Sequence, residues 1–393
     1  MPLLRLSLLL VTWATRARGA TGWSAPPLLD LPFVSTGQSP HGTLRLSGLS
    51  QGALTWTVSA DFQVSGLQLP LDGERLLEIS WTGDPSHPAL AAGQLELRAD
   101  GELVHVDLYA VVGDARLPAA VAWETDAWGS LTIAPLPSAP FPDGVAPYRD
   151  ASVLVAIPAG FDPAGPVGEV LHLHGFHAVL ATVVDSQHLR QEQARSGRNA
   201  LLVVPQGPLD AADGDFGRLV DPGGAAALLR DAISLAYRDG RVQRPVLGPV
   251  VLSSHSGGYR AAAAILRSGG LSVDSVHLFD SLYGDADTFA AFAMGGGRLL
   301  SVSTARGGTR SHNQALAAAL RSRGLGVGEA FDDASLGADR VIIGTTEASH
   351  DDCLTEDHAF ARWLRASGLP AIPSVIPPAG SPPHPAAWKE APH

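Results

Sequence analysis

Residues 249–266 read Pro-Val-Val-Leu-Ser-Ser-His-Ser-Gly-Gly-Tyr-Arg-Ala-Ala-Ala-Ala-Ile-Leu. The apolar residues before Ser253 predict a buried strand, and the alanine-rich residues after Gly258 predict a helix. Ser256 lies on the turn between them, and the residues two before and two after it, Ser254 and Gly258, are small. Such residues are needed where a strained turn lifts a serine side chain out of a sheet. The stretch therefore predicts a strand, a sharp turn and a helix that expose one hydroxyl group.

Short apolar runs alternate with helical patterns over residues 149–370. This alternation favours an α/β domain, with a doubly wound, mostly parallel sheet and helices on both of its faces. The predicted strands are 152–157, 167–173, 199–204, 249–252, 275–279, 298–303 and 340–343, and the predicted helices are 222–237, 258–268, 286–294, 312–323 and 355–367.

Residues 28–112 alternate apolar and polar side chains between frequent turn signals, which predicts a smaller all-β sandwich. The order of Phe62-Gln-Val-Ser-Gly66, Leu69-Pro-Leu-Asp-Gly-Glu74 and Gly93-Gln-Leu-Glu-Leu97 resembles Hydin-like immunoglobulin-fold modules of exported bacterial proteins. The resemblance implies a spacer or a binding module that contacts a polymer or a cell surface. The predicted strands are 42–47, 53–59, 75–81, 94–98 and 103–109.

Three further segments complete the predicted organisation. Residues 1–19 combine a short basic start, a brief apolar stretch and small residues at a cleavage position, which predicts a signal peptide and a secreted or periplasmic protein. Residues 113–148 are rich in Pro, Ala and Gly and predict a linker, although 130–133 has the pattern of a strand. Residues 371–393 predict an extended proline-rich tail.

Charge and cysteine content exclude several classes of function. The chain has a formal net charge of -12 and a single lysine, Lys389, so it offers no basic surface for nucleic acid or an anionic membrane. No further apolar run is long enough to predict a transmembrane segment. The single cysteine, Cys353, allows no internal disulfide, so stability depends on core packing.

Polar motifs follow successive predicted strands of the α/β domain. They are His172-Leu-His-Gly-Phe176, Val204-Pro-Gln-Gly207, the Ser256 turn, Leu278-Phe-Asp-Ser-Leu-Tyr-Gly284 and Ala348-Ser-His-Asp351. Their order resembles that of the α/β-hydrolase superfamily, whose nucleophilic serine lies on a strand-turn-helix elbow and precedes the triad acid and histidine. The resemblance implies the α/β-hydrolase fold, with Ser256 as the nucleophile.

A serine hydroxyl needs a base to take its proton and an acid to orient that base. We predict His350 as the base, because it follows the last strand, and Asp280 as the acid, because it ends the strand after the nucleophile. A surface histidine and a turn-capping aspartate are the alternatives to these two roles. Asp280 is preferred over Asp285, Asp332 and Asp333, and His350 is preferred over His312 and His358.

The negative charge of a tetrahedral intermediate needs backbone N–H donors. The residue after the nucleophile, Gly257, is predicted to supply one donor, and the resemblance points to the backbone of Phe176 for the second. The chain has His-Gly-Phe-His at 174–177 where the family often has His-Gly-Gly-Gly. The segments 206–218 and 283–297 are expected to line the pocket, by analogy with the fold.

The histidines at 172, 174 and 177 allow a different interpretation, because His-x-His on a strand can bind zinc or another transition metal. No carboxylate or further histidine at metal-site spacing accompanies them. Neither a metal nor an organic cofactor is therefore expected.

These patterns predict an exported serine hydrolase that cleaves a small or polymeric carboxylic ester through an acyl-enzyme. Preference for an ester over an amide rests only on the family's usual activity. Two alternatives stay open, which are a serine amidase or peptidase and a non-catalytic extracellular binding or adhesion protein with a degenerate hydrolase domain.

Overall fold

The computed structural model describes most of the chain. The described residues are 17–18, 23–26, 28–31, 34–35, 37–49, 53–68, 74–86, 89–99, 101–112, 121–142, 144–243 and 247–373. Of the predicted signal peptide only Ala17 and Arg18 are described, as strand β1 paired with β2 (Ser24–Ala25). The remainder of that segment and residues 374–393 of the predicted tail lie outside the described residues.

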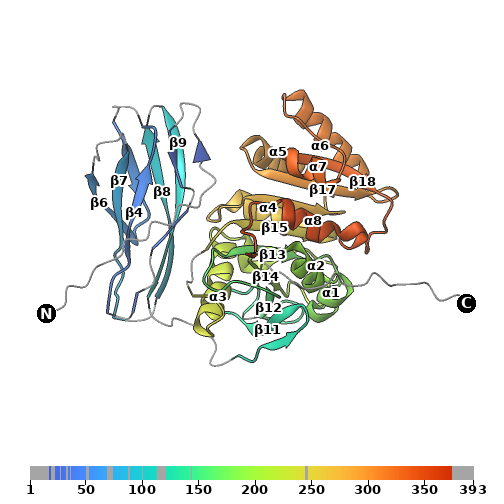
Figure 1. The fold of residues 1–393 in the computed structure, drawn as a ribbon, viewed down its shortest axis with the longest axis horizontal. Helices are drawn as coiled ribbons and strands as arrows, with labels where there is room; N and C mark the ends of the chain where they lie inside the picture. The colour runs from blue at the N-terminus through green and yellow to red at the C-terminus, as the bar shows by residue number, and fades with distance from the viewer. Residues whose placement is uncertain are drawn as a thin grey trace, which may run out of the picture.

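A nine-stranded sheet forms the centre of the larger part of the molecule (Figure 1). Strands β13 to β18 pair in parallel through β14-β13-β15-β16-β17-β18, whereas β10, β11 and β12 form an antiparallel edge. The predicted mostly parallel α/β sheet is confirmed. Its strands are β10 (Glu124–Asp126), β11 (Gly129–Pro135), β12 (Ser152–Pro158), β13 (Gly168–Leu173), β14 (Ala200–Pro205), β15 (Val250–His255), β16 (Ser275–Phe279), β17 (Arg298–Thr304) and β18 (Val341–Thr346).

Helices cover both faces of this sheet because successive residues of each strand point to opposite sides. Leu171 and Leu252 pack with apolar residues of α3, α4, α5 and α6, whereas Val170 and Val251 pack with those of α1, α2, α7 and α8. The helices are α1 (Leu180–Ser186), α2 (Leu189–Ser196), α3 (Gly224–Arg238), α4 (Tyr259–Ser268), α5 (Ala286–Met294), α6 (Arg310–Ser322), α7 (Asp333–Ala338) and α8 (Ala359–Ala366), with short 3-10 turns at Gly217–Val220, Ser256–Gly258 and Glu356–His358.

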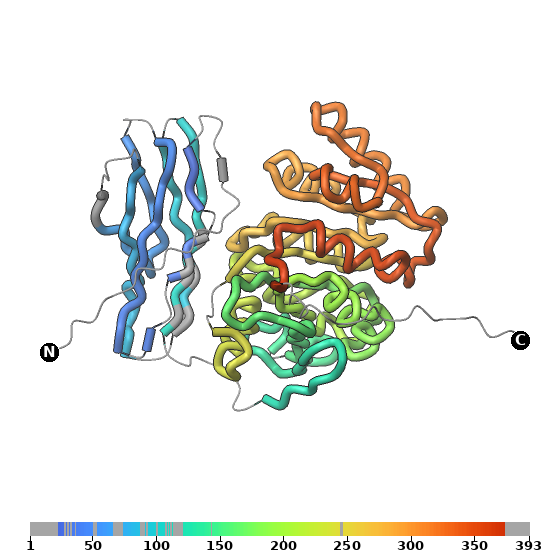
Figure 2. The backbone as a smooth tube through the Cα atoms, in the orientation of Figure 1, coloured from blue at the N-terminus to red at the C-terminus, as the bar shows by residue number. Residues whose placement is uncertain are grey.

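Two features of this part differ from the sequence-based prediction. Strands β10 and β11 lie inside the predicted linker 113–148, so the α/β part begins before the predicted boundary at residue 149. Helices α1, α2 and α7 were not predicted, because they are short and α2 buries polar side chains such as Glu192 and Gln193. After β18 the chain continues into α8, which is in contact with α2 (Figure 2).

The smaller N-terminal part contains two sheets around one apolar core. The orders are β3-β9-β8-β5 and β4-β7-β6, and all their pairs are antiparallel except β3 with β9. Trp23, Leu44, Leu77 and Val106 are among the core residues. The strands are β3 (Leu28–Asp30), β4 (His41–Leu46), β5 (Thr55–Val58), β6 (Phe62–Gln68), β7 (Arg75–Trp81), β8 (Ala89–Ala99) and β9 (Glu102–Val112).

The strand order of the large sheet identifies where a site is expected. Strand β13 lies between β14 and β15, so the chain leaves β13 toward one side and later returns on the other. In parallel α/β sheets, ligands bind beyond the carboxyl ends of strands at such a reversal. The segments that follow β13 and β15 here contain Gly175 and Ser256.

Candidate active site

Ser256 lies on a strained turn between β15 and α4. Its φ of 52° is in the left-handed region, which costs on the order of 1–3 kcal/mol for a residue with a side chain. A Cβ on Gly258 would lie only 2.4 Å from the carbonyl oxygen of Leu173, so the position must be glycine. The hydroxyl of Ser281 donates to the backbone carbonyl of Ser256 at 2.8 Å and holds the turn from the neighbouring strand end.

The left-handed conformation leads to a prediction about stability. The free energy of unfolding of Ser256→Gly should be about 1 kcal/mol higher than that of Ser256→Ala, because glycine adopts positive φ without the steric penalty of a Cβ atom. Both variants lack the hydroxyl, so the difference isolates the backbone. Denaturant unfolding measures it, and equal unfolding free energies would show that the turn is not strained.

Asp280 follows β16 and is buried, with a side chain that is 1% exposed. Its carboxylate accepts hydrogen bonds from the Thr304 amide at 3.3 Å, the Thr304 hydroxyl at 3.0 Å and the Thr309 hydroxyl. Burial favours the neutral acid, but the hydrogen bonds from His350, Thr309 and Thr304 outweigh burial and lower the pKa of Asp280 to about 2. The carboxylate is therefore ionised at neutral pH.

His350 lies in the loop after β18 and is bound to Asp280. Its Nδ1–H donates to Oδ2 of Asp280 at 2.7 Å, and its side chain is 38% exposed. The hydrogen bond to Asp280 raises the pKa of His350, and burial opposes this effect. Among the described residues, Nε2 of His350 has no hydrogen-bond partner, so this nitrogen can accept a proton.

The ring of His350 lies beside the Ser256 turn. Its centroid is 4.6 Å from that of His255, the residue before Ser256, with 35° between the ring planes. In the described part of the chain no hydrogen bond joins the Ser256 hydroxyl to His350. Hydrogen bonds between nucleophile and base are often long without substrate and tighten when substrate binds.

The loop after β13 lies over the Ser256 turn. A Cβ on Gly175 would lie 3.2 Å from Oγ of Ser256, and one on Gly257 would lie 2.4 Å from Cε1 of Phe176. The two predicted donor residues, Gly257 and Phe176, are therefore in contact. The backbone N–H of Phe176 donates to no protein acceptor within the described residues.

The other aspartates considered for the acid have different partners. Asp285 pairs with Arg267 at 2.5 Å, Asp332 caps α7 by accepting from the Ser335 amide at 2.9 Å, and Asp333 pairs with Arg362 at 2.9 Å. Only Asp280, among these four, contacts His350.

The remaining histidines that were considered also have separate partners. His358 pairs with Glu192 at 3.0 Å, and His312 lies on α6. His172 and His174 are buried and hydrogen-bonded through both ring nitrogens, whereas exposed His177 faces Asp210 at 3.4 Å. No group of three or more His, Cys, Asp or Glu side chains within the described ranges is arranged to hold a metal ion.

Several residues that shape this site were not singled out from the sequence. Thr304 and Thr309 bind the Asp280 carboxylate, Ser281 fixes the Ser256 carbonyl, and Gln187 and His255 are linked to the loop of His350. Thr304 could have been found from the sequence, because it follows a predicted strand next to the strand that Asp280 ends. Gln187 lies in an unpredicted helix-to-helix turn, and no local pattern indicated its contacts.

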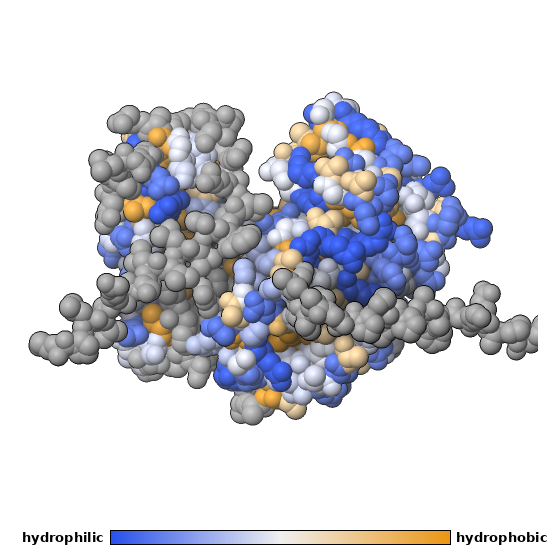
Figure 3. Space-filling view, viewed as in Figure 1, coloured by the Kyte–Doolittle hydropathy of each residue, from blue (hydrophilic) through white to orange (hydrophobic). Residues whose placement is uncertain are grey.

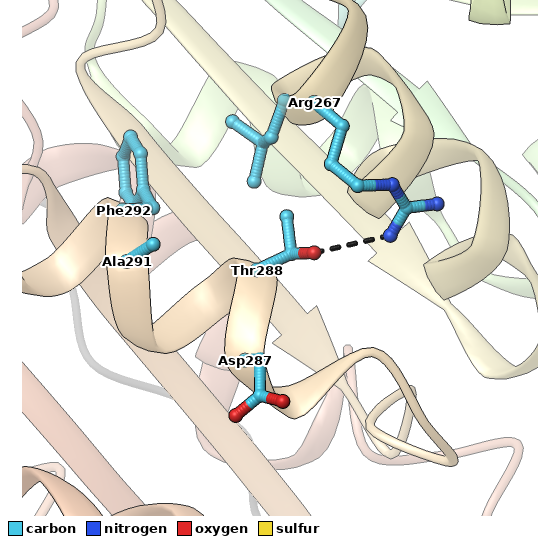
Figure 4. Close-up of a pocket in the computed structure, with 6 residues that line it drawn as sticks. Arg267, Asp287, Thr288, Ala291 and Phe292 are labelled. Atoms are coloured by element: carbon cyan, nitrogen blue, oxygen red, sulfur yellow. Dashed lines mark hydrogen bonds between the residues drawn. The ribbon is translucent and has the colours of Figure 1, made fainter.

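A separate pocket lies between α4 and α5 (Figure 4). Arg267 reaches across it to donate to the Thr288 hydroxyl at 3.0 Å. None of Ser256, Asp280 and His350 lines it. Its lining residues are Leu266, Arg267, Asp287, Thr288, Ala291 and Phe292.

The visible face of the α/β part mixes hydrophilic and hydrophobic residues (Figure 3). Within the described residues, none of the helices has the length and apolar content required to cross a lipid bilayer.

Comparisons with known proteins give only distant similarities. No family model matches the chain, and no curated protein matches it. It is similar to an endo-fucoidan hydrolase of glycoside hydrolase family 107, with 18% identity and a TM-score of 0.19 over 24% of this chain and 14% of that one. It is also similar to an uncharacterized protein from Bacillus cereus, with 13% identity and a TM-score of 0.33 over 51% of this chain and 61% of that one. The chain thus spans less than two thirds of either structure, and these TM-scores support no argument about activity.

Proposed function

We propose that the protein is a serine hydrolase of the α/β-hydrolase type that cleaves a carboxylic ester. The observation that carries the proposal is the 2.7 Å hydrogen bond between Asp280 and Nδ1 of His350, with the His350 ring beside the strained Ser256 turn. The arrangement supplies an acid, a base and a nucleophile in the chain order Ser, Asp, His. The reversal of strand order beside Ser256 supports the same assignment.

In the proposed reaction, Nε2 of His350 takes the hydroxyl proton of Ser256 as Oγ attacks the ester carbonyl carbon. The carbonyl electron pair moves onto oxygen, where the backbone N–H groups of Gly257 and Phe176 stabilise the negative charge. The intermediate collapses, the bond to the alcohol oxygen breaks, and His350 gives its proton to the alcohol. Water then attacks the acyl-enzyme by the same steps and releases the acid and free Ser256.

The electrostatics of the site support these roles. Asp280 is ionised, and it holds the Nδ1–H of His350, which leaves Nε2 as the proton acceptor. A buried carboxylate in this position also stabilises the imidazolium that forms when Ser256 loses its proton. No step of the proposed reaction uses a metal ion or an organic cofactor.

We also propose that residues 28–112 form an immunoglobulin-like module that contacts a polymer or cell surface, and that the protein is exported. The two small sheets around one core support an immunoglobulin-like architecture, and the resemblance of the sequence supports contact with a polymer or cell surface. The sequence pattern of residues 1–19 supports the second.

The proposed activity predicts covalent labelling by a fluorophosphonate probe and turnover of a short-chain p-nitrophenyl ester. The labelled peptide should contain Ser256, because the probe reacts with a serine hydroxyl activated by a neighbouring base. The corresponding p-nitroanilide distinguishes an esterase from an amidase or peptidase. Folded protein that shows neither labelling nor turnover would contradict the proposal and favour a non-catalytic binding function.

A further inference from the structure

A series of buried hydrogen bonds lies on the face of the sheet that α1, α2 and α8 cover, and it ends on the backbone of His350. Oγ of Ser253 lies 3.0 Å from Nδ1 of His172, whose Nε2 lies 3.2 Å from Oε1 of Gln187. Nε2 of Gln187 lies 3.0 Å from Nδ1 of His255, and Nε2 of His255 lies 2.9 Å from the carbonyl oxygen of His350. Ser253, His172, Gln187 and His255 are all buried.

Only one assignment of donor and acceptor to each hydrogen bond is consistent with this series. The carbonyl of His350 can only accept, so Nε2 of His255 carries the hydrogen and Nδ1 of His255 accepts from the Gln187 amide. The Gln187 oxygen then accepts from Nε2–H of His172, whose Nδ1 accepts from the Ser253 hydroxyl. Every polar atom in this series has a partner, as buried polar networks require.

Both histidines in the series are neutral at neutral pH. Burial lowers the pKa of His172 to about 3 and that of His255 to about 4. The other charges and donors near His255 are His350, Asp351 and Asp280. Because the two rings stay neutral, the direction of the hydrogen bonds is preserved under the conditions in which a serine hydrolase works.

We propose that His255 is a positioning residue for His350, held in its Nε2–H tautomer by Gln187 and His172. This inference rests on the proposed function. His255 directly precedes Ser256 in the sequence, and its side chain is hydrogen-bonded to the backbone of His350. This one residue therefore fixes the position of the base relative to the nucleophile. The face of its ring against the His350 ring adds a second contact.

The loop that carries His350 needs such an anchor. The His350 side chain is 38% exposed, and within the described ranges Asp280 is the one hydrogen-bond partner of that side chain. The Cys353 thiol donates to the same His350 carbonyl at 3.2 Å, but a thiol is a weak donor. A displacement of about 1 Å at a reacting group can lower a rate roughly 100-fold.

The test compares three variants by kcat and KM for the p-nitrophenyl ester. His255→Phe should lower kcat on the order of 100-fold with little change in KM, because the base is displaced and substrate binding is not. His255→Gln should restore most of the activity, because its side-chain amide can donate to the His350 carbonyl. His277→Phe is the matched control, because His277 is also buried, on the neighbouring strand β16. Among the residues that the structure describes, its side chain hydrogen-bonds to Ser275 of its own strand alone, so kcat should stay unchanged.

A second variant covers the case in which His255→Phe does not fold. Gln187→Met removes the amide that fixes the His255 tautomer and should also lower kcat without changing KM. If His255→Phe or Gln187→Met folds with the kcat of the unaltered protein, the positioning role is overturned.

A measurement on the unaltered protein separates this proposal from the proposed function. Nitrogen-15 NMR of histidine-labelled protein should show His255 and His172 as Nε2–H tautomers. An Nδ1–H tautomer at His255 overturns the inference whether or not the protein cleaves esters. Absence of labelling and turnover with Nε2–H at His255 would instead reject the proposed function and leave the hydrogen-bond series as a structural support.

Discussion

Replacing Ser256 by alanine should lower kcat for ester hydrolysis on the order of a million-fold, because the three residues of a triad act as a unit. The variant loses the oxygen that forms the acyl-enzyme, whereas Asp280 and His350 keep their hydrogen bond. Covalent labelling by the fluorophosphonate probe should be abolished. Steady-state kinetics with the p-nitrophenyl ester and intact-mass analysis of the labelled protein measure both effects.

Ser268→Ala provides the matched control for this prediction. Ser268 is the last residue of α4, the helix that follows the Ser256 turn, and its hydroxyl donates to the Ile265 carbonyl rather than to any residue of the site. Its kcat should equal that of the unaltered protein. If Ser256→Ala retained the original rate while Ser268→Ala lost it, the assignment of the nucleophile would be wrong.

Replacing Asp280 by asparagine should lower kcat about ten-thousand-fold at neutral pH. The carboxylate accepts from His350, Thr304 and Thr309, and an asparagine cannot accept at both of its terminal atoms. The amide nitrogen would face these donors, and His350 would be able to carry its hydrogen on Nε2. That nitrogen could then no longer take the proton of Ser256.

The pH dependence of the Asp280→Asn variant should shift in a defined direction. His350 acts as a base only when neutral, so kcat/KM falls as pH decreases through its pKa. Asp280 raises that pKa, so removal of the carboxylate should move the acidic limb of the pH profile to lower pH. An unchanged acidic limb would show that Asp280 does not control the protonation of His350.

Asp285→Asn is the control for this variant. Asp285 also follows β16 in the chain, but its carboxylate pairs with Arg267 near the surface. Its replacement should leave kcat and the acidic limb unchanged. A larger loss in Asp285→Asn than in Asp280→Asn would transfer the role of the acid to Asp285.

Local sequence patterns predicted the elements of the large sheet well. The predicted strand 275–279 is β16, and the predicted helix 286–294 is α5. Apolar runs buried on both faces and amphipathic helices produce strong periodic signals. The Ser256 turn was also predicted, because the small residues that such a turn requires are close neighbours of Ser256 in the sequence.

Contacts between distant residues could not be predicted in the same way. The sequence suggested Asp280 and His350 separately, but not the two threonines that bind the carboxylate from the end of β17 and the start of α6. The partner of His255 is Gln187, which lies in a polar stretch between two short helices. Such contacts depend on the register of neighbouring strands, which spacing within one segment does not reveal.

The edge of the large sheet was only partly predicted: residues 130–133 have the pattern of a strand, but they were assigned to a linker. Strands β10 and β11 lie in a segment rich in Pro, Ala and Gly, where composition favoured a linker. Pairing of β11 along the full length of β12 stabilises it as a strand. Tertiary context therefore overrides the local tendency of this segment.

Strands β13, β15, β16, β17 and β18 pair in parallel, so their carboxyl ends lie at one edge of the sheet and together form the candidate site. Gly175, Ser256, Asp280, Thr304 and His350 each follow or end a different one of these strands. Contacts between residues so far apart in the sequence require the closure of long loops before they can form. His350 follows β18, so a chain that ends before β18 lacks the proposed base, and we expect such a chain to show no esterase activity.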